Sequence, residues 1–123
     1  MKFFVSGKFG TEEEAKATMR ALQDAGHQIT LDWTAFGDLR PYDQNSSASR
    51  EAAIAETHGV READVLVLMA NDKGVGMYVE LGIAISLGIP IRVITDMENL
   101  TIFFHHPLVR RVKSIGEVIR EFS

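Results

Sequence analysis

Hydrophobic residues in this chain cluster in short runs that indicate buried strands. Residues 3–5, 65–69 and 91–94 are mostly apolar, and residues 28–31 form a fourth, mixed run. Continuous apolar runs of this length are typical of parallel strands that helices cover on both faces. Residues 109–112 are a weaker strand candidate, and we expect 100–104 to be either a short strand or a loop anchor.

Helical spacing of apolar residues appears directly after the first strand. Thr11 and Glu14 have the form of a capping box, in which the Thr11 hydroxyl covers the first amides and Glu14 reaches back. The apolar face then continues to Leu22, and Gly26 stands where a glycine commonly ends a helix. We therefore expect the first strand to lead through a turn into a helix.

The periodicity disappears over residues 34–47, where Gly, Pro, Asp, Asn and Ser predict a loop that is functional or mobile. Helical patterns return over residues 48–62, before Gly88, and from Ser114 to the end of the chain, with Ser114 as the cap. Strands that alternate with helices form βαβ units with right-handed crossovers. We expect one α/β domain over residues 1–123, a flavodoxin- or Rossmann-like three-layer sandwich with a mostly parallel sheet of four or five strands.

Composition narrows the possible functions. The 123 residues are 46% hydrophobic and 24% charged, as in a single soluble domain. The net charge of −4 provides no basic surface for a nucleic acid polymer. The lack of cysteine excludes disulfides, thiolate metal sites and a cysteine nucleophile.

Targeting, membrane and metal signals are also missing from the sequence. No apolar run approaches the ~20 residues of a membrane helix, and residues 1–5 do not resemble a signal peptide. His27 and His58 have no partner at metal-ligand spacing, while His105 and His106 are adjacent and make a poor chelate. We expect a cytoplasmic protein that uses no metal or cofactor.

The segment from Asn71 to Gly82 carries the most specific chemistry, because it joins an apolar strand to a helix and contains Glu80. Open α/β sheets bind their ligands just beyond the carboxyl ends of the strands. We expect Glu80 in the first helical turn, where free amides favour an anion and keep it ionised. Such a carboxylate can attack the anomeric carbon of a sugar, although early-helix glutamates are also common without any function.

Two glycines precede Glu80 and one acidic residue precedes them. Gly74 and Gly76 would let the backbone approach a ligand closely, or would simply form a tight turn. Asp72 would hydrogen-bond a base or a hydroxyl, or would be a solvated turn residue. The pattern is neither the dinucleotide-binding fingerprint nor a phosphate-binding P-loop.

Residues elsewhere in the chain add candidates. Glu56 lies on the inward stripe of its helix, so burial would raise its pKa and suit it as a general acid, unless it is a surface-edge glutamate. Ser6 and Gly7 end the first strand and would present polar groups to a sugar or phosphate, or form an ordinary turn. Aromatic residues of the long loop would cover a nucleobase, although such residues are more often packing anchors: Trp33, Phe36 and Tyr42.

Together these motifs resemble the nucleoside 2-deoxyribosyltransferase superfamily, which includes the deoxynucleoside-monophosphate N-glycosidases. The resemblance rests on Ser-Gly-Lys-Phe at residues 6–9, Ala-Asp-Val-Leu-Val at 63–67, the glycine–glutamate motif at 74–84 and Gly-Ile-Pro-Ile at 88–91. It implies cleavage or transfer at the N-glycosidic bond of a 2′-deoxynucleoside, a nucleoside or a nucleoside 5′-monophosphate.

The resemblance also assigns roles to residues. It implies that Glu80 is the nucleophile that captures the sugar and that Glu56 holds the substrate or protonates the leaving base. Asp72 is a further candidate to assist departure of the base. Candidate substrate-binding residues are Ser6, Gly7, Phe9, Gly74, Gly76 and Tyr78. It further implies a homodimer in which each site is completed by its neighbour, near His105 and His106.

This sequence departs from the family pattern at two places. Residues 77–79 separate Gly76 from Glu80, where the best-studied transferases have a single residue. Phe3 or Phe4 occupies the region of a first-strand tyrosine that touches the nucleophile, and Tyr78 is a candidate to supply the hydroxyl.

Two other functions fit parts of the sequence. A phosphoribohydrolase of the cytokinin-activating kind shares the spacing from Gly74 to Glu80, but Lys73 and Met77 replace its glycine and threonine. A non-catalytic protein that binds a nucleotide or an ADP-ribose-like ligand would explain the missing tyrosine.

Overall fold

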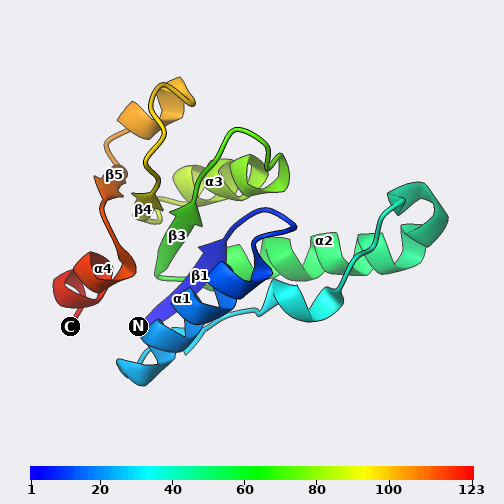
Figure 1. The fold of residues 1–123 in the computed structure, drawn as a ribbon, viewed down its shortest axis with the longest axis horizontal. Helices are drawn as coiled ribbons and strands as arrows, with labels where there is room; N and C mark the ends of the chain where they lie inside the picture. The colour runs from blue at the N-terminus through cyan, green and yellow to red at the C-terminus, as the bar shows by residue number, and fades with distance from the viewer.

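The computed structural model describes residues 1–123 and shows a single five-stranded sheet between two layers of helices (Figure 1). All strand pairs are parallel, and the order across the sheet is β2-β1-β3-β4-β5. The strands are β1 (Lys2–Ser6), β2 (Gln28–Ile29), β3 (Val65–Met69), β4 (Ile91–Ile94) and β5 (Val109–Val112). This is the predicted α/β three-layer architecture.

Four α-helices and three short 3-10 helices connect the strands. The α-helices are α1 (Glu12–Asp24), α2 (Ser46–Arg61), α3 (Gly76–Ser86) and α4 (Ile115–Glu121). The 3-10 helices are η1 (Trp33–Phe36), η2 (Tyr42–Asn45) and η3 (Ile102–His105). None of these helices combines the length and the apolar character needed to span a membrane.

The sheet separates two hydrophobic clusters, and β1 contributes to both. Phe4 packs in the cluster that contains residues of α2 and α3, while Phe3 and Val5 pack in the cluster that contains residues of α1 and α4. Alternate residues of a strand point to opposite faces, so Ser6 lies on the same face as Phe4. The strand therefore directs Ser6 toward α3.

The first helix does not use the predicted capping box. The Thr11 hydroxyl donates to the Lys8 carbonyl at 2.7 Å and makes no cap to the helix amides. It is Glu12, not Glu14, that reaches back, accepting from the Gly10 amide at 2.9 Å. The Thr11 hydroxyl closes the β1–α1 turn instead, because the carbonyl three residues earlier is within its reach.

The predicted C-terminal end of α1 and the predicted N-terminal cap of α4 are confirmed. Gly26 has a φ of +94° after α1, the left-handed conformation that favours glycine. Ser114 caps α4 by accepting from the Glu117 amide at 3.4 Å.

The long predicted loop is more ordered than its sequence indicates. Residues 34–47 contain most of η1 and all of η2, and α2 begins at Ser46 rather than residue 48. Residues 100–104 enter η3 and form no strand, and β2 ends at Ile29. The 3-10 helices are single turns, and the first turn of α2 is exposed and rich in serine. Neither contains a periodic pattern of apolar residues, so the sequence pattern does not predict them.

Candidate active site

A cavity of about 440 Å³ lies at the carboxyl edge of the sheet, beside β1 and β3. It is lined by the β1–α1 turn, the segment from Trp33 to Tyr42, one face of α2, and the β3–α3 turn with the start of α3. From β1 the chain crosses to β2 on one side, and from β2 it returns to β3 on the other side of β1. The strand order therefore reverses at β1. Open α/β sheets bind ligands at this switch point.

Glu80 reaches the cavity from α3, but not from its first turn. The helix begins at Gly76, so Glu80 is its fifth residue, and the prediction of a first-turn position is wrong. The side chain lies under the cavity with only 6% of the residue exposed. The Ser6 hydroxyl donates to Glu80 Oε1 at 2.5 Å.

The environment of Glu80 favours its neutral form. Burial, the largest cause, and the neighbouring Glu56 raise the pKa of Glu80 to about 9, while the hydrogen bond from Ser6 opposes both. The expectation that Glu80 is ionised at neutral pH is therefore wrong. The helix dipole stabilises a charge mainly within the first turn, and Glu80 lies beyond that turn. The loss of hydration on burial therefore has the larger effect on the pKa of Glu80.

Glu56 is the second carboxyl group of the site. It lies on α2, is half-buried and lines the same cavity as Glu80, as its position on the inward stripe predicts. Its carboxyl group lies near that of Glu80 and helps to raise the pKa of Glu80. Two adjacent carboxylates would repel each other, so the proximity of Glu56 favours the neutral form of Glu80.

Ser6 has a different place from the one predicted. It is fully buried and does not line the cavity, because its hydroxyl lies beneath the surface and bonds Glu80. Its neighbour Gly7 does line the cavity, and so does Phe9 at the rim. The Arg40 guanidinium lies 4.3 Å from the centre of the Phe9 ring and is paired with Asp38 at 3.1 Å.

The β3–α3 turn is held by Asn71, whose Oδ1 accepts from the amides of Lys73 at 2.9 Å and Gly74 at 3.0 Å. A Cβ at Gly74 would lie 2.3 Å from Met77 Cε and 2.7 Å from Lys8 Cβ. A Cβ at Gly76 would meet nothing within 4 Å. Close packing therefore requires glycine at position 74 only, although both glycines line the cavity.

Asp72 and Tyr78 are not brought into this cavity. Asp72 is exposed and does not line it. The Tyr78 hydroxyl donates to the Asn71 carbonyl at 2.7 Å, so it is not the hydroxyl that contacts Glu80. Burial raises the pKa of Tyr78, and the charge of Asp72 raises it further.

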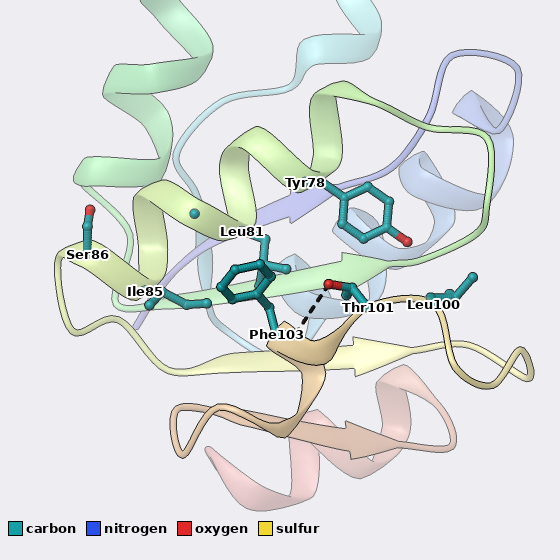
Figure 2. Close-up of a pocket in the computed structure, with 8 residues that line it drawn as sticks. Tyr78, Leu81, Ile85, Ser86, Leu100, Thr101 and Phe103 are labelled. Carbon is teal, nitrogen blue, oxygen red and sulfur yellow. Dashed lines mark hydrogen bonds between the residues drawn. The ribbon is translucent and has the colours of Figure 1, made fainter.

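Tyr78 instead lines a second cavity of about 450 Å³ between α3 and residues 100–103 (Figure 2). Its walls are mainly apolar, with Leu81 and Ile85 on α3 facing Leu100 and Phe103. This cavity contains no carboxyl group and is not the catalytic candidate.

The structure adds residues that sequence reasoning undervalued or missed. Trp33, Phe36 and Tyr42 all line the switch-point cavity, so the aromatic residues of the long segment are more than distant packing anchors. Lys8, Arg40 and Lys73 also line it and bring three cations together in an acidic protein. Their convergence has no local sequence signal, because they come from three separate turns.

Nowhere in the structure do three or more carboxylate or imidazole side chains gather in an arrangement that would hold a metal ion.

The sequence matches no protein-family model and no curated protein. The structure resembles the CMP N-glycosidase BcmB of Clostridium botulinum, with a TM-score of 0.66 at 13% identity over 99% of this chain and 98% of that one. It also resembles a 2-deoxyribosyltransferase from the psychrotolerant bacterium Bacillus psychrosaccharolyticus, with a TM-score of 0.60 at 18% identity over 97% and 90% of the two chains. The chain therefore shares its fold with these two enzymes, and the predicted resemblance is confirmed at the level of the fold.

Proposed function

We propose that this protein cleaves or transfers the N-glycosidic bond of a nucleoside or nucleoside 5′-monophosphate, with Glu80 as the nucleophile. The observation that carries the proposal is the pair of neighbouring carboxyl groups, Glu80 and Glu56, that line the switch-point cavity. A glycosyl-enzyme route needs one carboxylate to attack carbon and a second acidic group to move a proton. The fold shared with an N-glycosidase and a deoxyribosyltransferase supports this class of reaction.

The reaction begins with the proton that burial retains on Glu80. Its transfer to Glu56 leaves Glu80 as a carboxylate and Glu56 as a neutral acid, so one step prepares both groups. Glu80 then attacks C1′ of the sugar. The bond from C1′ to the base nitrogen breaks, its electron pair passes to the base, and the base receives the proton of Glu56.

The second half of the reaction releases Glu80. Glu56, now a carboxylate, accepts a proton from a water molecule as the water oxygen bonds C1′. The bond between C1′ and Glu80 breaks and its electron pair returns to the carboxylate. A free base that attacks instead of water gives transfer rather than hydrolysis.

The rest of the cavity supports a nucleoside or its monophosphate as the substrate. Lys8 and Lys73, with the first amides of α3, provide a positive environment for a 5′-phosphate. The rings of Trp33, Phe36 and Tyr42 provide flat apolar surface for the base.

The test is incubation of the purified protein with nucleosides, deoxynucleosides and their 5′-monophosphates, with and without a free acceptor base, followed by chromatography. We expect release or exchange of base, at least a thousandfold loss in Glu80→Gln, and a smaller loss in Glu56→Gln. Glu51→Gln, an exposed substitution on the same helix as Glu56, is the control. Activity confined to ribonucleoside 5′-monophosphates would favour the phosphoribohydrolase alternative.

One observation favours a second candidate, a non-catalytic protein that binds nucleotides. A buried Glu80 that retains its proton is a hydrogen-bond donor rather than a nucleophile. Saturable binding of a monophosphate, without release of base from any substrate, would support this alternative over the enzyme.

We further propose that a second copy of this chain covers α3. The only ionisable carboxyl of α3 is the buried Glu80, and apolar side chains remain on its outer face, with Val75 80% and Val79 61% exposed. A helix that is apolar all round is normally covered. Phe103, which lines the second cavity (Figure 2), is also exposed, and so is its neighbour in sequence, Ile102. The amino-terminal half of α2 projects beyond the sheet (Figure 1).

The dimer proposal is tested by light scattering coupled to size-exclusion chromatography. We expect a mass of two chains, reduced to one chain in Val79→Lys. The control is Ala17→Lys, an exposed position on α1, whose buried residues pack on the other face of the sheet. A monomeric wild-type protein at high micromolar concentration would contradict the proposal.

A further inference from the structure

The side chain of Ser6 makes one hydrogen bond, to Glu80. Ser6 is the last residue of β1, none of it is exposed, and its hydroxyl donates to Glu80 Oε1 at 2.5 Å across 74 residues of sequence. It does not line the cavity, so it cannot bind substrate directly. The hydroxyl acts on the cavity only through Glu80.

The strand presents this hydroxyl rigidly. Ser6 pairs with Leu68 in the parallel ladder of β1 and β3, which fixes the position of its Cβ. The preceding residue on the same face of β1 is Phe4, whose ring is buried. This ring packs against α2 at Gly59, where an added Cβ would lie 3.0 Å from Cε2 of Phe4. Phe4 has no polar atom to offer, so Ser6 is the residue of β1 that contacts Glu80 through a hydrogen bond.

We propose that Ser6 is the positioning residue of the nucleophile: its hydroxyl holds Oε1 of Glu80, favours the carboxylate form, and leaves Oε2 to bond the sugar. This inference rests on the proposed function and deepens it.

The chemistry of a donated hydrogen bond gives Ser6 two effects. A hydroxyl that donates to a carboxylate stabilises the charged form more than the neutral one, and the Ser6 bond accordingly lowers the pKa of Glu80 against the effect of burial. The same bond strengthens when the bond from C1′ to Glu80 breaks, because negative charge then returns to the carboxylate. Ser6 thus assists both formation of the nucleophile and its release from the sugar.

The main test compares Ser6→Ala with Ser6→Thr, which retains the hydroxyl. If deprotonation of Glu80 governs the rising limb of kcat/KM with pH, Ser6→Ala moves that limb upward by about one pH unit and lowers kcat roughly 10- to 100-fold. Ser6→Thr restores the position of the limb even if its extra methyl group lowers the Tm. Thr18→Ala is the matched control, because it removes another buried hydroxyl, which bonds the Glu14 carbonyl outside the site.

A second readout does not need turnover. The Glu80 side-chain carboxyl carbon, labelled with ¹³C and assigned by its loss in Glu80→Gln, is titrated by NMR in wild type and Ser6→Ala. We expect a higher titration midpoint in Ser6→Ala and an unchanged one in Thr18→Ala. An unchanged midpoint in Ser6→Ala overturns the positioning role, whereas a shifted midpoint in a protein that releases no base would leave Ser6 in place and overturn the proposed function.

Discussion

The indole Nε1 of Trp33 donates a hydrogen bond of 2.7 Å to the carbonyl of Val5, the residue before Ser6. The bond ties η1 to the end of β1, and the Trp33 ring lies 3.4 Å from where a Cβ on Gly7 would stand. The aromatic wall of the cavity is thereby anchored to the strand that carries the partner of Glu80. The proposed substrate-binding and catalytic parts of the site are therefore both attached to the end of β1.

We predict that Trp33→Phe lowers the free energy of unfolding by about 1–3 kcal/mol, because the carbonyl of the fully buried Val5 loses its side-chain donor. Urea denaturation measures this change. Tyr42→Phe is the control, since Tyr42 lines the same cavity but is 56% exposed, and we expect a change below about 0.5 kcal/mol. Equal stability of Trp33→Phe and wild type would show that the bond is not maintained.

The protonation of Glu80 predicts a dependence of stability on pH. Because the pKa of Glu80 is raised on folding, the folded chain binds more protons than the unfolded chain between the ordinary glutamate pKa and about 9. Stability therefore falls as pH rises through this window, with a slope of up to about 1.4 kcal/mol per pH unit from this group.

Glu80→Gln removes that slope. Denaturation at pH 5, 6, 7 and 8 should show wild type losing stability relative to Glu80→Gln as pH rises. A constant difference between the two proteins across these pH values would mean that Glu80 is ionised in the folded chain.

The two cavity glycines give a matched pair. Gly74→Ala places a Cβ within contact distance of Lys8 Cβ and Met77 Cε, so we predict a loss of about 1–3 kcal/mol from overpacking of the turn. Gly76→Ala meets no neighbouring atom at the start of α3 and should be neutral or stabilise the protein by up to about 1 kcal/mol. Thermal denaturation separates the two, and similar effects would contradict the close approach of the two turns.

The C-terminal helix is held by charge. Glu121 accepts hydrogen bonds from Arg92 at 2.6 Å and 2.9 Å and also bonds Arg110, and these bonds lower the pKa of Glu121, chiefly through Arg92. Their contribution is present above the unfolded pKa and is lost as pH falls. We predict that Glu121→Gln costs roughly 1–2 kcal/mol at pH 7 and little at pH 3.

The control for this prediction is Glu13→Gln. The Glu13 side chain is 90% exposed and pairs with Lys16 only at 3.7 Å, so its loss should be close to neutral at both pH values. A loss in Glu121→Gln that is the same at pH 3 and pH 7 would assign the effect to packing rather than charge.

The local sequence was sufficient to predict the strands and helices that have a clear pattern of hydrophobic residues. The runs containing Phe4, Leu66 and Val93 became the three central strands, and Ser114 and Gly26 marked helix ends as expected. Prediction failed where several local bonds compete, as at Thr11, whose hydroxyl had both a cap and a turn within reach. It also failed for η1 and η2, which are too short to show a period.

The sequence by itself determined the α/β alternation, the carboxyl-edge position of the glycine turn and the identities of Glu80 and Glu56 as candidates. Only the tertiary structure decided which groups meet: Ser6 contacts Glu80, while Tyr78 and Asp72 lie outside the cavity. It also decided that burial raises the pKa of Glu80. The reason is that local pattern reflects the backbone, whereas the charge of a carboxyl depends on the burial and partners that chain segments far apart in sequence provide.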